Sequence, residues 1–417
     1  MSQEVAQSLE DRLVRYARIA TQSREGVDQV PSTACQLELL KVLQEELTEM
    51  GAQDVRLTES GFVIATLPAS LAQREVPTVA FLAHVDTATD FPALDVKPVV
   101  HRSYDGSAIV LPGDPTKVLD ETTAPGLASN VGTTIITSDG TTLLGADDKS
   151  GIAIIMTLAE TLLNTPEVPH GAIRVCFTPD EEIGTGINAL SLDELDADVA
   201  YTLDGENLGE VTYESFSADK AVVRITGVAI HPGKAKGRLV NALTLAGKLI
   251  SLLPQHARTP ETTDEREGFI HLVHMTGTAA ETELHFILRD FELAGLESHA
   301  LALQAACDAL TLLEPRATVE CTVSRQYRNM RYWLEADLRP ADLAVEAVRR
   351  AGVAPAIKPI RGGTDGSQLT ERGLPTPNLF ASIHNAHGPL EWTSVREMEA
   401  SYTTCLELVK LWAEESA

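Results

Sequence analysis

A chain of 417 residues is too long for one hydrophobic core of ordinary size, so we expect two or three domains. Its 44% hydrophobic and 22% charged residues are typical of a globular protein and exclude an extended disordered chain. The formal net charge of −27, from 33 Lys and Arg against 60 Asp and Glu, argues against nucleic acid or an anionic membrane as a partner.

The first residues predict an amphipathic helix, because apolar side chains recur there at helical spacing among acidic ones (Val5, Leu9, Leu13 and Tyr16). They form neither the apolar run of a membrane span nor the pattern of a signal peptide. The five cysteines lack C-x-x-C spacing, which indicates reduced thiols rather than disulfides or thiolate zinc sites (Cys35, Cys176, Cys307, Cys321 and Cys405). We therefore expect a cytoplasmic protein.

Between residues 77 and 204, strand-like apolar runs alternate with helical patterns, which predicts an α/β domain with a mixed, largely parallel sheet. The stretch 90–142 is rich in Pro, Gly, Asp and Thr, so we expect a long surface excursion or hairpin there. In sheets of this kind, catalytic groups collect in the loops that leave the carboxyl ends of the strands.

The rhythm changes near residue 212, where the order strand, helix, strand, strand, helix, strand predicts a β-α-β-β-α-β unit. After Tyr327, helices and strands alternate again, and the chain ends in a long helical pattern. We therefore predict a domain formed by residues 1–211 and 327–417, into which a second domain, residues 212–326, is inserted.

His84 and Asp86 end an apolar strand pattern and are two residues apart, so they face the same side of the strand. A histidine that binds a metal ion usually donates its other N–H to an oxygen, and Asp86 is placed to orient the ring in this way. Taken alone, a histidine at a strand end is more often structural.

Two further turns crowd carboxylates together. Asp147 and Asp148 lie between a strand and an apolar helix, where one carboxylate shared by two cations would relieve their repulsion. Helix capping is the alternative for a single Asp. Asp180, Glu181 and Glu182 follow another strand; one could ligate metal while its neighbour takes a proton from water, although a solvated acidic turn is the alternative.

Asp204 and Glu206 follow a strand in the same manner, and His384 and His387 lie in a Gly- and Pro-marked loop before the last helix. His387, which precedes a glycine, is the better candidate of the two histidines. Coincidence in five separate turns is a poor explanation for so many metal-ligand side chains. Histidine with carboxylates suits Zn²⁺, with Co²⁺ or Mn²⁺ as alternatives.

Other reaction classes fit poorly. The segment GVAIHPGKAKG fails as a phosphate-binding loop, because the spacing of Gly227 and Gly233 is wrong and Ala235 follows Lys234 where Ser or Thr belongs. The chain has no G-x-S-x-G nucleophile elbow, and no cysteine accompanies the histidine clusters.

Several segments together resemble the M20 family of di-zinc metallopeptidases, in family order from about residue 80 to 390 (HVDT at 84–87, TTLLGADDKSG at 141–151, PDEEIGTG at 179–186, YTLDG at 201–205, IHPGKAKG at 230–237, then RDFE, GGTDG and the late N-x-H-G). The resemblance is to the tripeptide aminopeptidases of that family. It implies two zinc ions, the first held by His84 and Asp204, the second by Glu182 and His387, with Asp147 as the bridge.

The resemblance also assigns the catalytic roles. Asp86 would orient His84, and Glu181 would be the general base that activates a bridging water and later protonates the leaving amine. The inserted domain would be a lid and dimerisation domain, which implies a homodimer. From it, His231 would reach the oxyanion of the tetrahedral intermediate, often in the neighbouring subunit's site.

Four substrate contacts are weaker predictions. Arg289 has the planar fork that suits the terminal carboxylate of a peptide. Arg361 and Gly363 lie in RGGTDG, where backbone N–H groups could approach the substrate, although a plain turn is an equal interpretation. Asn329 is the weakest candidate.

The sequence therefore predicts an aminopeptidase that cleaves the first bond of short peptides, most simply tripeptides. An alternative keeps the two-metal site in a dipeptidase, a carboxypeptidase or an N-acyl amino acid amidohydrolase. A second alternative is a non-catalytic binder of metal or peptide, against which Glu181 argues.

Overall fold

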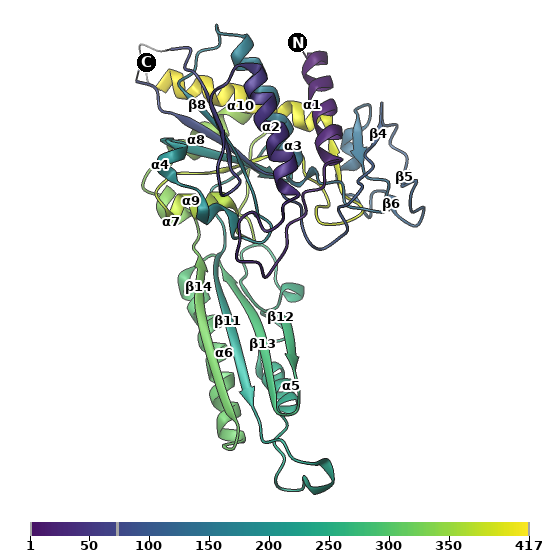
Figure 1. The fold of residues 1–417 in the computed structure, drawn as a ribbon, viewed down its shortest axis with the longest axis vertical. Helices are drawn as coiled ribbons and strands as arrows, with labels where there is room; N and C mark the ends of the chain where they lie inside the picture. The colour runs from purple at the N-terminus through teal and green to yellow at the C-terminus, as the bar shows by residue number, and fades with distance from the viewer. Residues whose placement is uncertain (1, 72–74, 416–417) are drawn as a thin grey trace. The chain divides into compact units, whose positions relative to one another are not determined.

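A computed structural model of the chain, which describes residues 2–71 and 75–415, divides into two compact units (Figure 1). The first unit comprises Met1–Tyr213, Trp333–Lys358 and Thr364–Ala417, and the second comprises Glu214–Tyr332 and Pro359–Gly363. The second unit therefore runs past the predicted segment 212–326 to residue 332. It also takes in 359–363, which the sequence had assigned to the first domain.

Backbone pairing explains why residues 359–363 lie with the second unit. Ser215 and Ile360 form a parallel β-bridge, and the N–H of Phe216 donates to the carbonyl oxygen of Ile360 at 3.1 Å. The Arg361 guanidinium donates to the carbonyls of Glu265 and Glu267 at 3.0 and 2.9 Å. These contacts join segments that are distant in sequence, so no local sequence pattern predicts them.

The first unit is built on an eight-stranded mixed sheet, counted over the described residues, with the order β1-β2-β8-β3-β9-β16-β10-β15. Its strands are β1 (Gln53–Leu57), β2 (Val63–Leu67), β3 (Val79–His84), β8 (Ile173–Thr178), β9 (Val199–Gly205), β10 (Glu210–Thr212), β15 (Ala356–Ile357) and β16 (Asn378–Phe380). The four central strands β8, β3, β9 and β16 are mutually parallel. Their carboxyl ends therefore meet at one edge of the sheet.

Central parallel strands are covered on both faces, and every residue of β3 is accordingly buried. One face packs against the larger core, to which the long helices contribute: α1 (Ser2–Ala17), α2 (Gln36–Met50), α3 (Ala146–Asn164), α8 (Arg339–Arg350) and α10 (Val395–Glu415). The other face packs a smaller core beside η2 (Gly186–Ala189), α4 (Leu192–Leu195) and α9 (Asp365–Glu371).

The predicted excursion at 90–142 forms short strands rather than one hairpin: β4 (Val99–His101), β5 (Ile109–Val110), β6 (Val118–Leu119) and β7 (Ile135–Thr137), with the 3-10 helix η1 (Leu127–Asn130). β7 lies between β4 and β17 (Trp392–Ser394), which comes from the end of the chain. Trp392 is fully buried in a small core with residues of the excursion. The excursion thus anchors the segment that follows His387.

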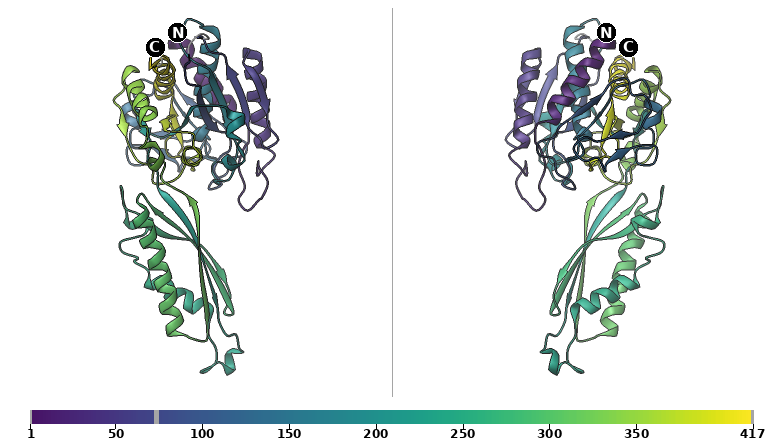
Figure 2. Two further views of the ribbon diagram at one scale, coloured as in Figure 1. Left: turned by 90° about the vertical axis from the view of Figure 1, so that its left-hand side faces the viewer. Right: turned by 90° about the vertical axis from the view of Figure 1, so that its right-hand side faces the viewer.

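The second unit has the predicted β-α-β-β-α-β order: β11 (Ser217–Thr226), α5 (Ala242–Leu252), β12 (Phe269–Gly277), β13 (Glu281–Asp290), α6 (Leu293–Leu313) and β14 (Thr318–Tyr327). Its four strands form an antiparallel sheet in the order β12-β13-β11-β14. Both helices cover one face of this sheet, as Figure 2 shows, and bury its apolar residues. Short segments complete the unit and the chain between the units: η3 (Pro232–Lys234), η4 (Pro260–Thr262) and α7 (Arg331–Leu334).

The fold class expected from the sequence, a mixed and largely parallel α/β sheet with an inserted β-α-β-β-α-β unit, is confirmed. Among the described residues, no helix combines the length and apolarity that crossing a membrane requires.

Candidate metal centre

Four of the five candidate ligands come from the edge where the central parallel strands end. His84 is the last residue of β3, and Asp204 is the penultimate residue of β9. Glu182 follows β8, and His387 lies in the loop after β16. Asp147 stands at the start of α3, where its backbone is not helical (φ −80°, ψ 103°). Parallel pairing therefore brings together side chains as far apart in the sequence as His84 and His387.

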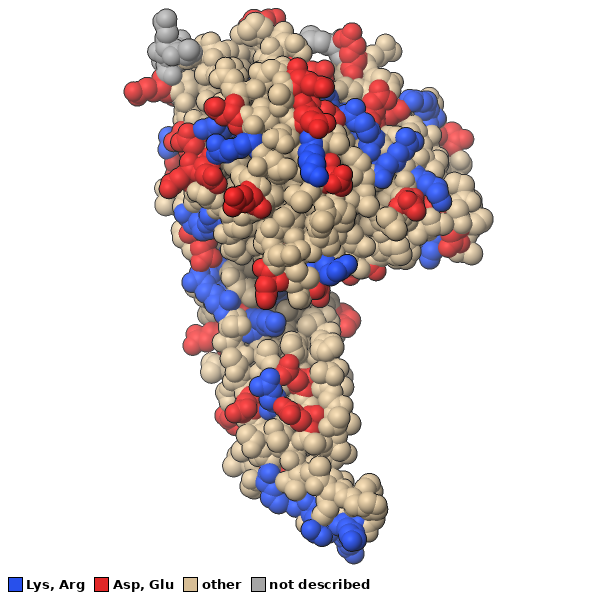
Figure 3. Space-filling view, in the orientation of Figure 1, with Lys and Arg blue, Asp and Glu red and all other residues tan. Residues whose placement is uncertain are grey.

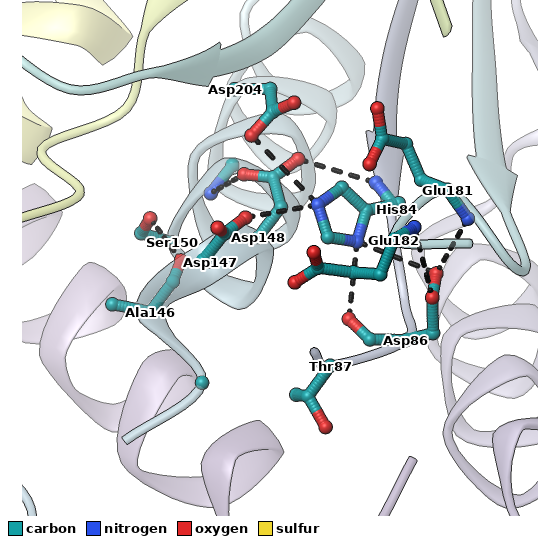
Figure 4. A network of polar contacts seen from close by, with 12 residues as sticks. His84, Asp86, Thr87, Ala146, Asp147, Asp148, Ser150, Glu181, Glu182 and Asp204 are labelled. Carbon is teal, nitrogen blue, oxygen red and sulfur yellow. Dashed lines mark hydrogen bonds and ion pairs between the residues drawn. The ribbon is translucent and has the colours of Figure 1, made fainter. Parts of the chain in front are cut away.

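His84, Asp147 and Asp204 form one group whose ligand atoms all lie within 4.8 Å of one another. His84 Nε2 lies 2.9 Å from Asp147 Oδ1 and 3.8 Å from Asp204 Oδ1 (Figure 4). Its Nδ1 lies 3.1 Å from the backbone carbonyl oxygen of Asp86. That carbonyl accepts a hydrogen bond when Nδ1 carries the proton, and this tautomer leaves Nε2 free for an ion.

Asp147, Glu182 and His387 form a second group of the same kind. His387 Nε2 lies 3.0 Å from Glu182 Oε2 and 3.3 Å from Asp147 Oδ2. The two oxygens of Asp147 thus face the two groups, which is the geometry of a carboxylate shared between two cations.

The donor set fits divalent cations. Glu182 Oε1 is buried and has no hydrogen-bond partner among the described atoms, an expensive arrangement unless a cation occupies the space. Two imidazole nitrogens with three carboxylates make up the ligand chemistry that zinc prefers.

The charge of the group is poorly compensated within the chain. Burial, followed by the charge of Asp147, raises the pKa of Asp204 to about 6 and that of Glu182 to about 7. Hydrogen bonds that Asp147 and Glu182 accept from its ring raise the pKa of His387 to about 11. Burial would raise the pKa of Asp147, but hydrogen bonds from His387 and His84 outweigh it and lower that pKa. Without cations, the cluster therefore retains protons that metal binding would displace.

Asp86 and Glu181 lie next to the ligands. The carboxylate of Asp86 is fully buried and accepts the N–H groups of Glu181 and Glu182 at 3.0 and 3.2 Å, which fixes their turn. Its Oδ1 lies 3.5 Å from His84 Nδ1. Burial and the charge of Asp204 hold the pKa of Glu181 well above its usual range. Glu181 lines a small cavity with Leu82, Ala83, His84, Asp148, Thr202, Asp204 and Asp365.

His384, the competing ligand, is engaged elsewhere. Its ring stacks on Trp392 at a centroid distance of 4.0 Å, and its Nε2 lies 2.7 Å from Glu397. His384 and Glu206 belong to neither of the two ligand groups found among the described residues. The choice of His387 over His384 thus agrees with the geometry.

Sequence reasoning missed some residues of this centre and gave others no role. Glu391 accepts three backbone N–H groups at the start of α3, and Asp90 Oδ2 lies 3.3 Å from His387 Nδ1. Asp365 accepts a hydrogen bond from Thr178 at the end of β8, and Asp180 anchors its turn by accepting from Ser32 and Gln36. Asp180 and Asp365 lie in motifs that the sequence analysis noted, but without these roles. Glu391 had only a slight signal, a carboxylate between the apolar residues Leu390 and Trp392.

Two other predicted residues lie in the second unit. His231 is exposed in the loop between β11 and α5, where its Nδ1 accepts the N–H of Gly233 at 3.1 Å. The same loop carries exposed basic residues, visible at the end of the unit in Figure 3 (Lys234, Lys236 and Arg238). Arg289, near the end of β13, donates to Gln326 at 2.9 Å and lies over the Tyr327 ring.

Three predicted substrate contacts also have structural roles in the second unit. Asn329 is fully buried: its Oδ1 accepts from the N–H groups of Ser215 and Arg331, and its Nδ2 donates to the Phe291 carbonyl. Arg361 is held by the carbonyls already described and lies over the rings of Phe216 and Phe269.

Gly363 is explained by packing. A Cβ atom at this position would approach the Tyr327 ring to 2.4 Å, so the close ring requires glycine here. Contact of Gly363, Asn329 and Arg361 with a substrate stays a prediction.

Comparisons with known proteins identify the family of the chain. A family model described as "Peptidase family M20/M25/M40" matches residues 139–411. Peptidase T of Geobacillus kaustophilus is 43% identical over 99% of this chain and 100% of its own length.

Two solved structures share the fold. A tripeptidase from Staphylococcus aureus has a TM-score of 0.77 at 21% identity, covering 98% of this chain and 99% of that one. The aminopeptidase PepT from Bacillus cereus has a TM-score of 0.75 at 23% identity, with the same coverage. The enzyme class expected from the sequence is confirmed, and the chain belongs to the peptidase family M20/M25/M40.

Proposed function

We propose that this protein is a metal-dependent aminopeptidase that hydrolyses the first peptide bond of tripeptides. The observation that carries the proposal is the pair of ligand groups that share Asp147 at the carboxyl edge of the sheet. It occurs in a chain that aligns with Peptidase T along nearly its whole length. The Staphylococcus aureus protein with this fold is a tripeptidase, which supports the substrate class.

Two divalent ions, which we propose to be zinc, suit the centre. His84, Asp147 and Asp204 would hold one, and Asp147, Glu182 and His387 would hold the other. Bound there, such ions would polarise the scissile carbonyl and lower the pKa of the attacking water.

Glu181 is the proposed general base. Its raised pKa favours accepting a proton from the attacking water and then delivering that proton to the leaving amine. The Asp86 carboxylate holds the backbone of Glu181, which keeps the base at the end of β8 beside the ligands.

The second unit supplies the remaining proposed contacts. His231, which is exposed, would donate to the oxyanion of the tetrahedral intermediate. Arg289 would bind the terminal carboxylate of the peptide. We also propose that the protein forms a homodimer through this unit, on the strength of its family resemblance. The cytoplasmic location stays a prediction.

One assay tests the function. Purified protein is analysed for bound metal and offered di-, tri- and tetrapeptides with free and blocked N-termini, with and without a chelator. We expect release of the first residue from free tripeptides, abolished by the chelator and restored by Zn²⁺, Co²⁺ or Mn²⁺. Equal rates on N-blocked peptides would favour an acyl amidohydrolase, and release of the last residue would favour a carboxypeptidase; either result would refute the proposal.

A further inference from the structure

Glu391 has a position that the catalytic roles above do not explain. Its side chain is 1% exposed, and its carboxylate accepts three backbone N–H groups from the turn that enters α3. Oε2 lies 2.7 Å from the N–H nitrogen of Leu144 and 2.8 Å from that of Gly145, while Oε1 lies 2.9 Å from that of Asp147. The buried carboxylate of Glu391 thus fixes the backbone of Asp147, the residue that both ligand groups share.

The three donors converge for a local reason. Gly145 has φ 77°, in the left-handed region, and this conformation turns successive N–H groups toward one point. The point lies at the N-terminal end of a long helix, where the unpaired N–H groups and the helix dipole favour a negative charge. Glu391 therefore caps α3 from 244 positions away along the chain.

Glu391 is also tied to the other side of the centre. It lies four residues after His387, and its N–H donates to the carbonyl of Gly388 at 3.2 Å, which closes a turn between them. The next residue, Trp392, is fully buried and exchanges both backbone hydrogen bonds with His384. The backbone hydrogen bonds between His384 and Trp392 thus close the loop that carries His387. Glu391 joins this loop to the Asp147 turn.

We propose that Glu391 is a positioning residue that holds the shared ligand Asp147 in register with His387 and so sets the affinity of the centre for its pair of ions. This inference rests on the proposed two-metal function. Glutamine at this position would have nearly the same shape, but its amide nitrogen is a donor and would face a backbone donor. At least one buried N–H would then lose its partner, and the turn would relax.

The matched control is Glu397, a second buried glutamate near the same segment. It accepts from Asn130 and lies 2.7 Å from His384 Nε2, but contacts none of the proposed ligands. Metal-free wild type, Glu391→Gln and Glu397→Gln are each titrated calorimetrically with Zn²⁺, and their melting temperatures are measured without metal. For Glu391→Gln we expect the affinity for at least one ion to fall by about 10- to 100-fold, as for other residues that orient metal ligands. Glu397→Gln should bind both ions as the wild type does, whatever its melting temperature.

A second readout uses Co²⁺, whose visible absorption reports ligand geometry. Glu391→Gln should alter this spectrum, and Glu397→Gln should not. Wild-type affinity for both ions in Glu391→Gln, or an equal loss in both variants, would overturn the inference. Should Glu391→Gln fail to fold, Glu391→Asp, which keeps the charge but shortens the reach, takes its place with the same expected loss. If the wild type itself binds fewer than two ions, the proposed function is refuted. If the wild type binds two ions and Glu391→Gln binds them equally well, only the inference about Glu391 is refuted.

Discussion

The central sheet of the first unit and the four-stranded sheet of the second unit differ in where their charged side chains lie. At the edge of the first, His84, Asp204 and Glu182 lie largely buried, and burial raises the pKa of both carboxyl groups to about 6 and 7. In the second, β13 alternates between buried apolar and more exposed polar residues, and charged side chains such as Arg224 and Glu283 pair at the surface.

This contrast shows that the edge of the first sheet is less stable without a ligand than the second sheet is. Carboxylates crowded together in a buried place destabilise the folded chain unless cations neutralise them, because desolvation and repulsion act in the same direction. The edge of the first sheet therefore depends on a ligand, whereas the second sheet depends on its apolar face and the helices over it. Changes at the two places should have different consequences.

The largest effect is expected for Glu181→Gln. Removing the proposed general base should lower kcat by about 10²- to 10⁴-fold, because proton transfer at the reacting water is lost. Glu181 belongs to neither ligand group, so the bound metal should stay at the wild-type level. Kinetics on a tripeptide, together with metal analysis of the same sample, measure both quantities.

The neighbouring change Glu182→Gln serves as the comparison for that experiment. It removes a proposed ligand, so it should lower metal content as well as activity. Full tripeptidase activity in Glu181→Gln would contradict the assigned base.

The sequence predicts the residues of this centre whose place follows from a local pattern, and it does not predict those placed by contacts between distant segments. His84, Glu182 and Asp204 follow apolar strand patterns directly, and parallel strands end at one edge, so their meeting could be expected from the chain alone. Glu391 acts on a turn 244 positions away, and no local spacing encodes such a contact. The sequence shows only an isolated carboxylate in an apolar run.

The second unit gives the converse lesson. Its β-α-β-β-α-β order was readable because the hydrophobic period changes with each element. The packing roles of Asn329 and Gly363 could not be predicted from the sequence. Asn329 is a buried amide whose partners Ser215 and Phe291 lie in two distant segments, and Gly363 is a glycine made necessary by the Tyr327 ring. Residue type suggested only a substrate contact, which stays a prediction, and gave no sign of these packing roles.

A smaller but still large effect is expected for His231→Ala in the second unit. Loss of an oxyanion donor costs about 3 to 4 kcal/mol, so kcat should fall by roughly 10²- to 10³-fold. Metal content and the melting temperature should stay unchanged, because His231 is exposed and its described contact is local. The control is His274→Ala, an exposed histidine of β12, which should retain full activity. Equal kcat in both variants would remove His231 from the mechanism.

Stability without metal should fall as pH rises. The pKa values of Asp204 (about 6) and Glu182 (about 7) lie above their ordinary 3.8 and 4.5, and the pKa of His387 (about 11) lies above 6.5. In each case the folded chain binds more protons than the unfolded chain between the two values, so the free energy of unfolding decreases with pH across that window. Between pH 5.5 and 8.5, the melting temperature with chelator should drop by about 3 to 8 °C.

Saturating Zn²⁺ should weaken or reverse that slope, since the ligands must lose their protons to bind the ion. Glu182→Gln removes one of the titrating groups and should flatten the slope of the metal-free protein. Differential scanning calorimetry at several pH values, with chelator and with Zn²⁺, gives all the curves. A metal-free slope that is the same in Glu182→Gln would assign the effect to charges outside the centre.

The smallest effect is expected for Arg224→Ala on the exposed face of the second sheet. Arg224 pairs with Glu283 and Glu281 but is half exposed, and ion pairs in such places contribute little to stability because water and salt screen them. Phe286→Ala, on the buried face of the neighbouring strand, should instead lower the free energy of unfolding by about 3 to 5 kcal/mol, because it leaves a cavity under the helices. Denaturant unfolding of both variants compares the contributions of the two faces of the sheet to stability. The Zn²⁺ affinity of each folded variant is measured in a separate titration. If the surface pair proved to matter as much as the core phenylalanine, the second unit would also depend on its charges, and the contrast with the first unit would fail. Unchanged Zn²⁺ affinity in both variants is expected, because neither residue belongs to a ligand group.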